Sequence, residues 1–142
     1  MFKKTLIAAT LIALTAALVG VNKPAAAANS NEVRLRAQLT GNTLASGKAK
    51  YRERTRGNTL EQRFSVEVED STPGDLLAVT VNGVTFGTIV VNDLGVAELQ
   101  FRTTSFIDDP GDGKPLPPDF PMLMPGDFIT VGPDLSGTFA LD

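Results

Sequence analysis

The sequence predicts an all-β fold, a single antiparallel β-sandwich or flattened barrel of about seven or eight short strands. Apolar and polar residues alternate with period two over several short runs, which is the pattern of strands with one buried face. Turn residues recur about every ten positions between these runs. No helical periodicity of apolar residues is present after Asn29.

The first 28 residues have the pattern of a secretory signal peptide. Lys3 and Lys4 form a basic start, residues 5–21 are apolar or small, and Ala26-Ala27-Ala28 gives a small-residue cleavage pattern. The alternative is an uncleaved membrane anchor, but this 17-residue run is at the short limit for a span. We therefore expect cleavage before Asn29, a secreted or periplasmic domain over residues 29–142, and no membrane span after cleavage.

Two strands are expected to open this domain. Residues 33–39 alternate apolar and polar side chains. Residues 47–56 form a second strand with Ala49 and Tyr51 on its inner face and only basic side chains at the alternate outer positions. These basic residues, the basic stripe, are Lys48, Lys50, Arg52, Arg54 and Arg56.

A third strand is expected over residues 63–69, with Glu67 and Glu69 facing outward. In a tight hairpin these carboxylates come opposite Lys48 or Lys50. The basic stripe therefore has two interpretations. It is a solvated face paired with Glu67 and Glu69, or it is a binding face for an anionic ligand such as an anionic polysaccharide.

The central meander, residues 76–101, has the least ambiguous pattern in the chain. Asn82-Gly83 between two apolar runs predicts a type I′ hairpin turn, because both residues accept a positive φ. Residues 92–95 predict the second turn by the same chemistry. Gly87 is expected to mark a bulge that returns Ile89 to the core.

Residues 103–126 are expected to form a long acidic loop, because proline, glycine and aspartate dominate there. Four aspartates of this loop offer the hard oxygen ligands that Ca²⁺ prefers. They are Asp108, Asp109, Asp112 and Asp119. The other interpretation is a solvated loop whose aspartates and glycines form turns. A last hairpin is expected over residues 128–131 and 135–141.

The composition excludes several kinds of catalytic and metal site. The chain has no cysteine and no histidine, so it offers no Ser-His or Cys-His nucleophile pair and no ordinary zinc, copper or haem site. Residues 29–63 carry eight basic and three acidic side chains, whereas residues 64–142 carry two basic and thirteen acidic ones. We expect no general attraction to nucleic acid. We also expect no enzymatic activity, because paired carboxylates are the one kind of catalytic group that this composition leaves.

Six short segments carry a resemblance to known domains. They are Leu39-Thr40-Gly41, Gly47-Lys48-Ala49, Val66-Glu67-Val68, Val81-Asn82-Gly83, Gly95-Val96-Ala97-Glu98-Leu99 and Ser136-Gly137-Thr138-Phe139. Together they look like uncharacterised secreted β-domains of environmental bacteria, and residues 33–99 are distantly similar to the chordin-type CHRD domain. The resemblance implies a β-domain fold and an exported location, and it carries over no catalytic residue.

The sequence therefore predicts an exported, non-catalytic module with a binding or structural role at the cell surface or in the periplasm. Its partner would be a surface or matrix component. One alternative is a calcium-stabilised adhesion or matrix module that uses the acidic loop, and only this alternative includes a cofactor. The other is a small carboxylate-based hydrolase.

Overall fold

The computed structural model describes residues 31–142. Within them, Glu32–Asp142 form one compact unit. The predicted signal peptide of residues 1–28 lies outside the described residues, so its cleavage stays a prediction. Over the described range, no helix is long and apolar enough to cross a membrane.

The described residues form strands and two short 3₁₀ helices, which confirms the predicted all-β class. The longer strands are β1 (Glu32–Leu39), β2 (Ser46–Arg56), β3 (Thr59–Glu69), β4 (Leu76–Val81), β5 (Val84–Val90), β6 (Ala97–Arg102), β8 (Phe128–Val131) and β9 (Leu135–Thr138). Two strands have two residues each, β7 (Lys114–Pro115) and β10 (Ala140–Leu141). The 3₁₀ helices are η1 (Thr104–Phe106) and η2 (Pro110–Asp112).

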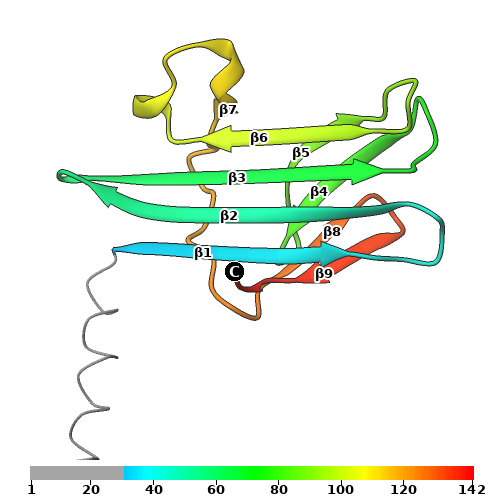
Figure 1. The fold of residues 1–142 in the computed structure, drawn as a ribbon, viewed down its shortest axis with the longest axis horizontal. Coiled ribbons are helices and arrows are strands. Elements are labelled where there is room, and N and C mark those ends of the chain that lie inside the picture. The colour runs from blue at the N-terminus through cyan, green and yellow to red at the C-terminus, as the bar shows by residue number, and fades with distance from the viewer. Residues whose placement is uncertain (1–30) are drawn as a thin grey trace, which may run out of the picture. The chain divides into compact units, whose positions relative to one another are not determined.

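The strands form two sheets, of six and four strands (Figure 1). The six-stranded sheet has the order β10-β1-β2-β3-β6-β7, and the four-stranded sheet has the order β5-β4-β8-β9. Neighbouring strands are antiparallel, as predicted, except that β6 and β7 are parallel. In Figure 1, β1, β2, β3 and β6 lie in front and the four-stranded sheet lies behind them.

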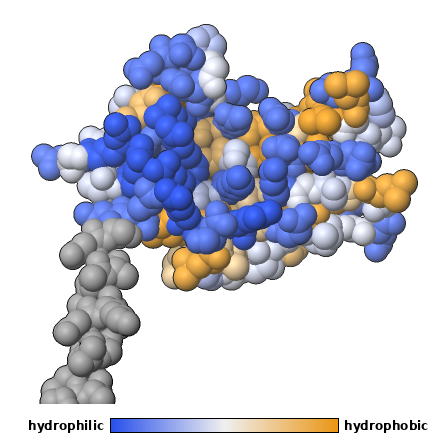
Figure 2. Space-filling model, viewed as in Figure 1, coloured by the Kyte–Doolittle hydropathy of each residue, from blue (hydrophilic) through white to orange (hydrophobic). Residues whose placement is uncertain are grey.

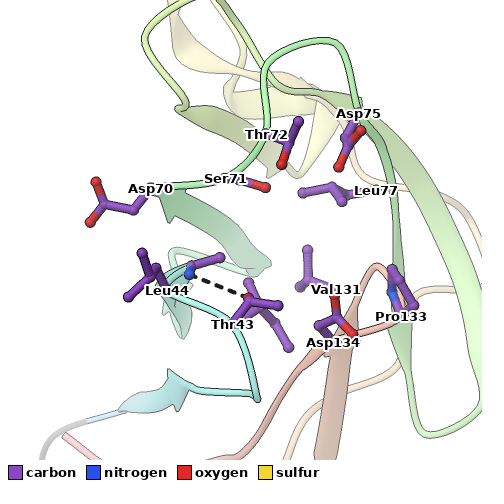
Figure 3. Close-up of a pocket in the computed structure, with 12 residues that line it drawn as sticks. Thr43, Leu44, Asp70, Ser71, Thr72, Asp75, Leu77, Val131, Pro133 and Asp134 are labelled. Atoms are coloured by element: carbon purple, nitrogen blue, oxygen red, sulfur yellow. Dashed lines mark hydrogen bonds between the residues drawn. The ribbon is translucent and has the colours of Figure 1, made fainter.

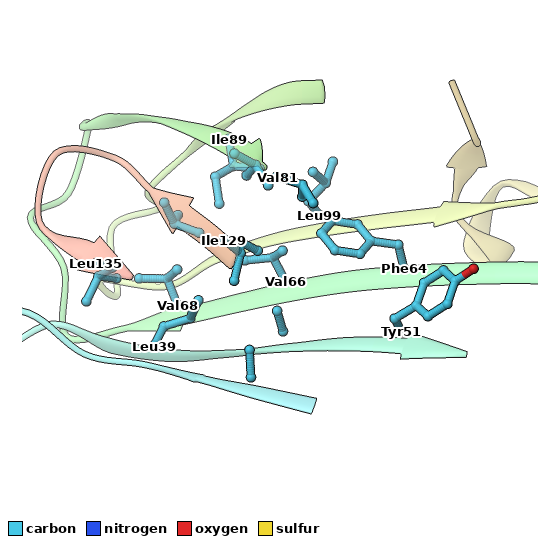
Figure 4. Packing of buried hydrophobic residues seen from close by; sticks show 14 of the residues in the cluster. Leu39, Tyr51, Phe64, Val66, Val68, Val81, Ile89, Leu99, Ile129 and Leu135 are labelled. Atoms are coloured by element: carbon cyan, nitrogen blue, oxygen red, sulfur yellow. The ribbon is translucent and has the colours of Figure 1, made fainter. Parts of the chain in front are cut away.

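The inward side chains of both sheets belong to one buried hydrophobic cluster (Figure 4). Leu39, Val66 and Val68 come from the six-stranded sheet, and Val81 and Ile129 come from the four-stranded sheet. Each of these positions belongs to a run with period-two alternation, so the sequence predicts which face of each strand is buried. Burial of this apolar surface is the main favourable term in the folding free energy.

The long loop closes the core at one end. Phe120 is buried, and the centre of its ring lies 4.9 Å from the ring centres of both Phe64 and Phe86, which belong to different sheets. The sequence predicts no strand in this segment, but Pro115 lies in β7. This edge position tolerates proline, because the missing N–H would face away from the neighbouring strand.

The turn between β4 and β5 follows the prediction. Asn82 and Gly83 have φ values of 48° and 85°, as a type I′ turn requires. The predicted bulge is also present, but the pairing register of β4 and β5 shifts after Val79 and leaves Phe86, not Gly87, as the extra residue.

The last predicted strand, residues 135–141, is wrong in one respect. It is divided at Phe139 into β9 and β10, which pair with β8 in one sheet and β1 in the other. The buried Phe139 donates its N–H to the carbonyl of Asp127 at 2.8 Å. The chain therefore crosses between the sheets here, which period-two alternation cannot reveal.

Candidate functional site

The basic stripe lies on the outer face of the six-stranded sheet. In β2 its side chains alternate with Ala49 and Tyr51, which are buried in the core. Figure 2 looks onto this face and shows a continuous, strongly hydrophilic band that crosses the strands near the β2–β3 hairpin.

Four arginines from four neighbouring strands form one line across this face, which we call the arginine row. Arg34 of β1 lies opposite Arg52 of β2, Arg52 lies opposite Arg63 of β3, and Arg63 lies opposite Arg102 of β6. Neighbouring strands are about 4.8 Å apart, so the row extends over about 14 Å. Like charges directly opposite each other destabilise a sheet, so the row requires carboxylates beside it.

Glu61 supplies the central carboxylate. Its Oε1 accepts hydrogen bonds from Arg63 Nε at 3.1 Å and Arg102 Nη2 at 3.0 Å. Its Oε2 accepts one from Arg54 Nε at 2.7 Å, and Arg56 Nη1 lies 3.6 Å from the same oxygen. Glu61 is 1% exposed although it lies on the outer face, because arginine side chains surround it.

The arginines also determine the charge of Glu61. Burial by itself would raise the pKa of this carboxyl. Hydrogen bonds from Arg54, Arg102 and Arg63 outweigh burial and lower the pKa from 4.5 to about 2. Glu61 is therefore ionised at neutral pH and holds these arginines in a fixed arrangement.

Two further carboxylates flank the row. Glu32 accepts a hydrogen bond from Arg52 Nη2 at 2.9 Å and pairs with Arg34, and these two hydrogen bonds lower the pKa of Glu32. Asp112 in η2 lies beside the other end, with its Oδ1 3.5 Å from Arg102 Nη1. Every arginine of the row therefore contacts a carboxylate.

The predicted pairing of the basic stripe with β3 is confirmed at one position. Lys48 Nζ lies 3.5 Å from Glu67 Oε1, whereas Glu69 lies opposite Ser46 and forms no salt bridge among the described residues. Glu67 also lies opposite Glu98 of β6. The positively charged band therefore ends at this level of the sheet.

A shallow depression of about 270 Å³ lies between the arginine row and that acidic level. Its polar lining residues are Lys50, Arg52, Arg63, Ser65, Gln100 and Asp112. Lys50 and the neighbouring Arg36 form no salt bridge with any carboxylate of the described residues. Within residues 31–142, Arg52 Nε is the one buried side-chain nitrogen or oxygen without a hydrogen-bond partner.

Around the arginine row and the depression beside it, cationic side chains outnumber carboxylates. The carboxylates are Glu32, Glu61 and Asp112. The cations are Arg34, Arg36, Lys50, Arg52, Arg54, Arg56, Arg63 and Arg102. Anionic groups placed here would meet guanidinium groups that are already oriented, with the neutral polar groups of Ser65 and Gln100 beside them.

The sequence predicts the basic face of β2, with Arg34 and Arg36 nearby, but it does not reveal that Glu61, Arg63 and Arg102 belong to this site. The predicted third strand starts at residue 63, so Glu61 is assigned to no face. Arg102 lies 41 positions after Glu61 and meets it only through the β3–β6 pairing. Charge segregation was the one available signal, because the basic residues are concentrated before residue 64.

The four predicted calcium ligands are not brought together as one ligand set. Asp109 Oδ1 accepts the Gly111 N–H at 2.8 Å, and Asp112 Oδ2 accepts those of Asp108 and Asp109 at 3.0 and 3.3 Å. Asp119 lies in a separate exposed turn. In the part of the chain that the structure describes, no three acidic side chains are grouped as a metal site requires. Calcium binding stays a prediction.

A second pocket, of about 310 Å³, lies between loops at one end of the sheets (Figure 3). Asp70, Asp75 and Asp134 line it together with the apolar Leu77 and Val131. Nothing in the sequence pattern marks these residues as a site. This pocket has no basic side chain in its lining, so its charge is opposite to that of the depression beside the arginine row.

No protein-family model matches the chain, and no curated protein matches it. The resemblance to CHRD domains stays a prediction. The proposed function therefore rests on the residues of the site.

Proposed function

We propose that the protein is an exported, non-catalytic β-sandwich module that binds an acidic polysaccharide on the outer face of its six-stranded sheet. The two sheets would be the layers of the sandwich, and the partner would be a surface or matrix component outside the cytoplasm. The observation that carries the proposal is the arginine row, with more cations than carboxylates around it.

The chemistry of the row favours carboxylate or sulfate groups. Each guanidinium presents N–H groups in a planar fork that matches such oxyanions. Glu61 and Glu32 orient the arginines before a ligand arrives, so less side-chain freedom is lost on binding. The row lies on an open sheet face, which suits a polymer that extends across several strands better than an enclosed small molecule.

The surroundings of the row favour a polysaccharide over a nucleic acid. Proteins that bind single-stranded nucleic acid stack bases on exposed aromatic rings. The aromatic residues at the depression, Tyr51, Phe64 and Phe101, are buried in the core and present no such ring. The chain is also acidic overall, so it has no general attraction to a polyanion, and any binding would be local to this face.

Retention on a column of immobilised uronate polysaccharide, close to physiological salt, tests the proposal. We expect the purified protein to be retained and then eluted by added salt, because screening weakens exposed charge pairs. Lys50→Ser, which removes an unpaired cation beside the row, should elute at lower salt than the unaltered protein.

Thr138→Asp is the matched control, because it changes the net charge by the same amount at an exposed position of the other sheet. It should elute close to the unaltered protein. Passage of the unaltered protein straight through the column, or equal loss of retention in the two variants, would refute the proposed binding face.

A further inference from the structure

One sheet edge, strand β5, lacks most of the features that usually prevent pairing with another chain. The two sheets have four edge strands, and β7 and β10 are only two residues long. Strand β9 is bridged to the end of β1, where Thr40 and Ser136 exchange two backbone hydrogen bonds of 3.0 Å. Strand β5 has seven residues, VTFGTIV, with no charge and no proline.

The backbone of β5 is free for pairing beyond its bulge. Val91 donates its N–H to the carbonyl of Asp75 and accepts the N–H of Gly74, so its polar groups point toward β4. Backbone direction alternates along an antiparallel strand, so those of Thr88 and Val90 point toward the open edge. Among the described residues, no backbone hydrogen bond outside the strand ladders involves residues 84–90.

The side chains at this edge suit contact with an identical strand. Val90 is 61% exposed, and its cross-strand neighbour Leu76 is 69% exposed. Thr88 is exposed and uncharged. Pairing of two β5 strands therefore places no like charges opposite each other, although the chain as a whole has a net charge of −3.

We propose that β5 pairs antiparallel with β5 of a second copy of this chain, with Thr88 opposite Val90 of the second copy. Such a contact is two-fold symmetric and closes at a dimer. The bulge at Phe86 interrupts regular pairing and limits the contact to the segment that follows it. The four-stranded sheets of the two copies would become one continuous sheet.

The dimer extends the proposed function without depending on it. The two-fold axis of an antiparallel strand pair is perpendicular to the sheet, so corresponding faces of both copies lie on the same side. The two six-stranded sheets would therefore present their arginine rows in the same direction. One polymer could then contact both rows.

The molar mass of the purified protein, measured by sedimentation over a wide range of concentrations, tests the pairing. We expect a monomer–dimer equilibrium for the unaltered protein. Thr88→Lys should remain monomeric, because a lysine on an edge strand opposes pairing. Thr138→Lys places the same charge on β9, the other edge of that sheet, and should dimerise normally.

Amide hydrogen exchange of the unaltered protein gives a second measurement that needs no variant. The amides of Thr88 and Val90 should become more protected as the protein concentration rises. A monomer at every concentration, or a dimer that Thr88→Lys leaves intact, would overturn the proposal. Protection of these amides that does not change with concentration would overturn it as well, and would indicate that another segment of the same chain covers the edge.

Discussion

At the scale of single residues, Glu61 determines how the site is organised. It lies on the outward face of β3, yet hydrogen-bonded arginines bury it. Removing one partner from a buried ionic cluster costs far more than removing an exposed pair, because the remaining charges lose their compensation. The stability of the β2–β3–β6 region should therefore depend on this one carboxylate.

Replacing Glu61 should destabilise the fold strongly. We expect Glu61→Gln to lower the free energy of unfolding by about 3 kcal/mol, because the arginines around it would lose their shared carboxylate. Glu67→Gln, which affects the more exposed pair with Lys48, should cost less than about 1 kcal/mol. Urea unfolding of both variants measures the difference, and equal losses would contradict this role of Glu61.

Glu61 should also make the stability of the folded protein sensitive to acid. The pKa of Glu61 is about 2 in the folded protein and near 4.5 for an ordinary glutamate. A lowered pKa stabilises the folded state above pH 4.5, and this contribution is lost as the pH falls from about 4.5 to about 2. Urea unfolding at several pH values should show a flatter curve for Glu61→Gln in that window than for the unaltered protein. Parallel curves would contradict the lowered pKa.

At the scale of elements, close backbone approach joins the two sheets at one edge. A side chain at Gly137 of β9 would collide with the backbone carbonyl of Gln38 in β1. A side chain at Gly87 of β5 would meet only the ends of two side chains, Leu99 at 3.4 Å and Phe101 at 3.5 Å. The contact between β1 and β9 therefore requires glycine at residue 137.

Alanine substitutions should distinguish these two glycines. Gly137→Ala should lower the free energy of unfolding by about 2 kcal/mol, because a backbone carbonyl cannot move aside as a side chain can. Gly87→Ala should change it by less than about 1 kcal/mol. Denaturant unfolding of both variants provides the comparison, and a larger loss for Gly87→Ala would contradict the close approach of β1 and β9.

The acidic loop should not depend on calcium. The carboxylates of Asp109 and Asp112 already accept backbone hydrogen bonds within the loop, and Asp112 also pairs with Arg102. We therefore expect the same melting temperature in excess calcium and in chelator. A clear rise with calcium would instead support the calcium-stabilised adhesion module, because a ligand that binds only the folded state raises its stability.

Strand existence and strand faces could be predicted from the sequence, because period-two alternation and Asn-Gly turns are local signals. The type I′ turn at Asn82-Gly83 and the buried face of β2 are examples. The partners of Glu61 could not be predicted, because they depend on the pairing of strands that are distant in sequence. The division of the last strand at Phe139 depends on which sheet each half joins, and alternation carries no information about that.

At the scale of the whole molecule, the proposed dimer links the edge of one sheet to the outer face of the other. If both arginine rows face the same way, binding to a polymer gains from the second contact without any new interaction. This gain depends on dimerisation alone, so a variant at β5 can remove it while both rows stay intact.

Retention of the edge variants should show this gain. We expect Thr88→Lys to elute from the uronate column at lower salt than Thr138→Lys, although both variants carry the same added positive charge. The added charge alone would predict equal retention of the two variants. Equal elution of the two lysine variants would contradict the bivalent arrangement. It would not contradict binding by a single copy, which the Lys50→Ser and Thr138→Asp variants test.

The most direct test of the binding face is a titration of the isotope-labelled protein with a uronate oligosaccharide, followed by the backbone amide signals. We predict saturable shifts at Ser65 and Gln100, which line the depression beside the arginine row, and loss of these shifts at high salt. No saturable shift at low salt, or shifts confined to the loops around Asp70 and Asp134, would contradict binding at the arginine row.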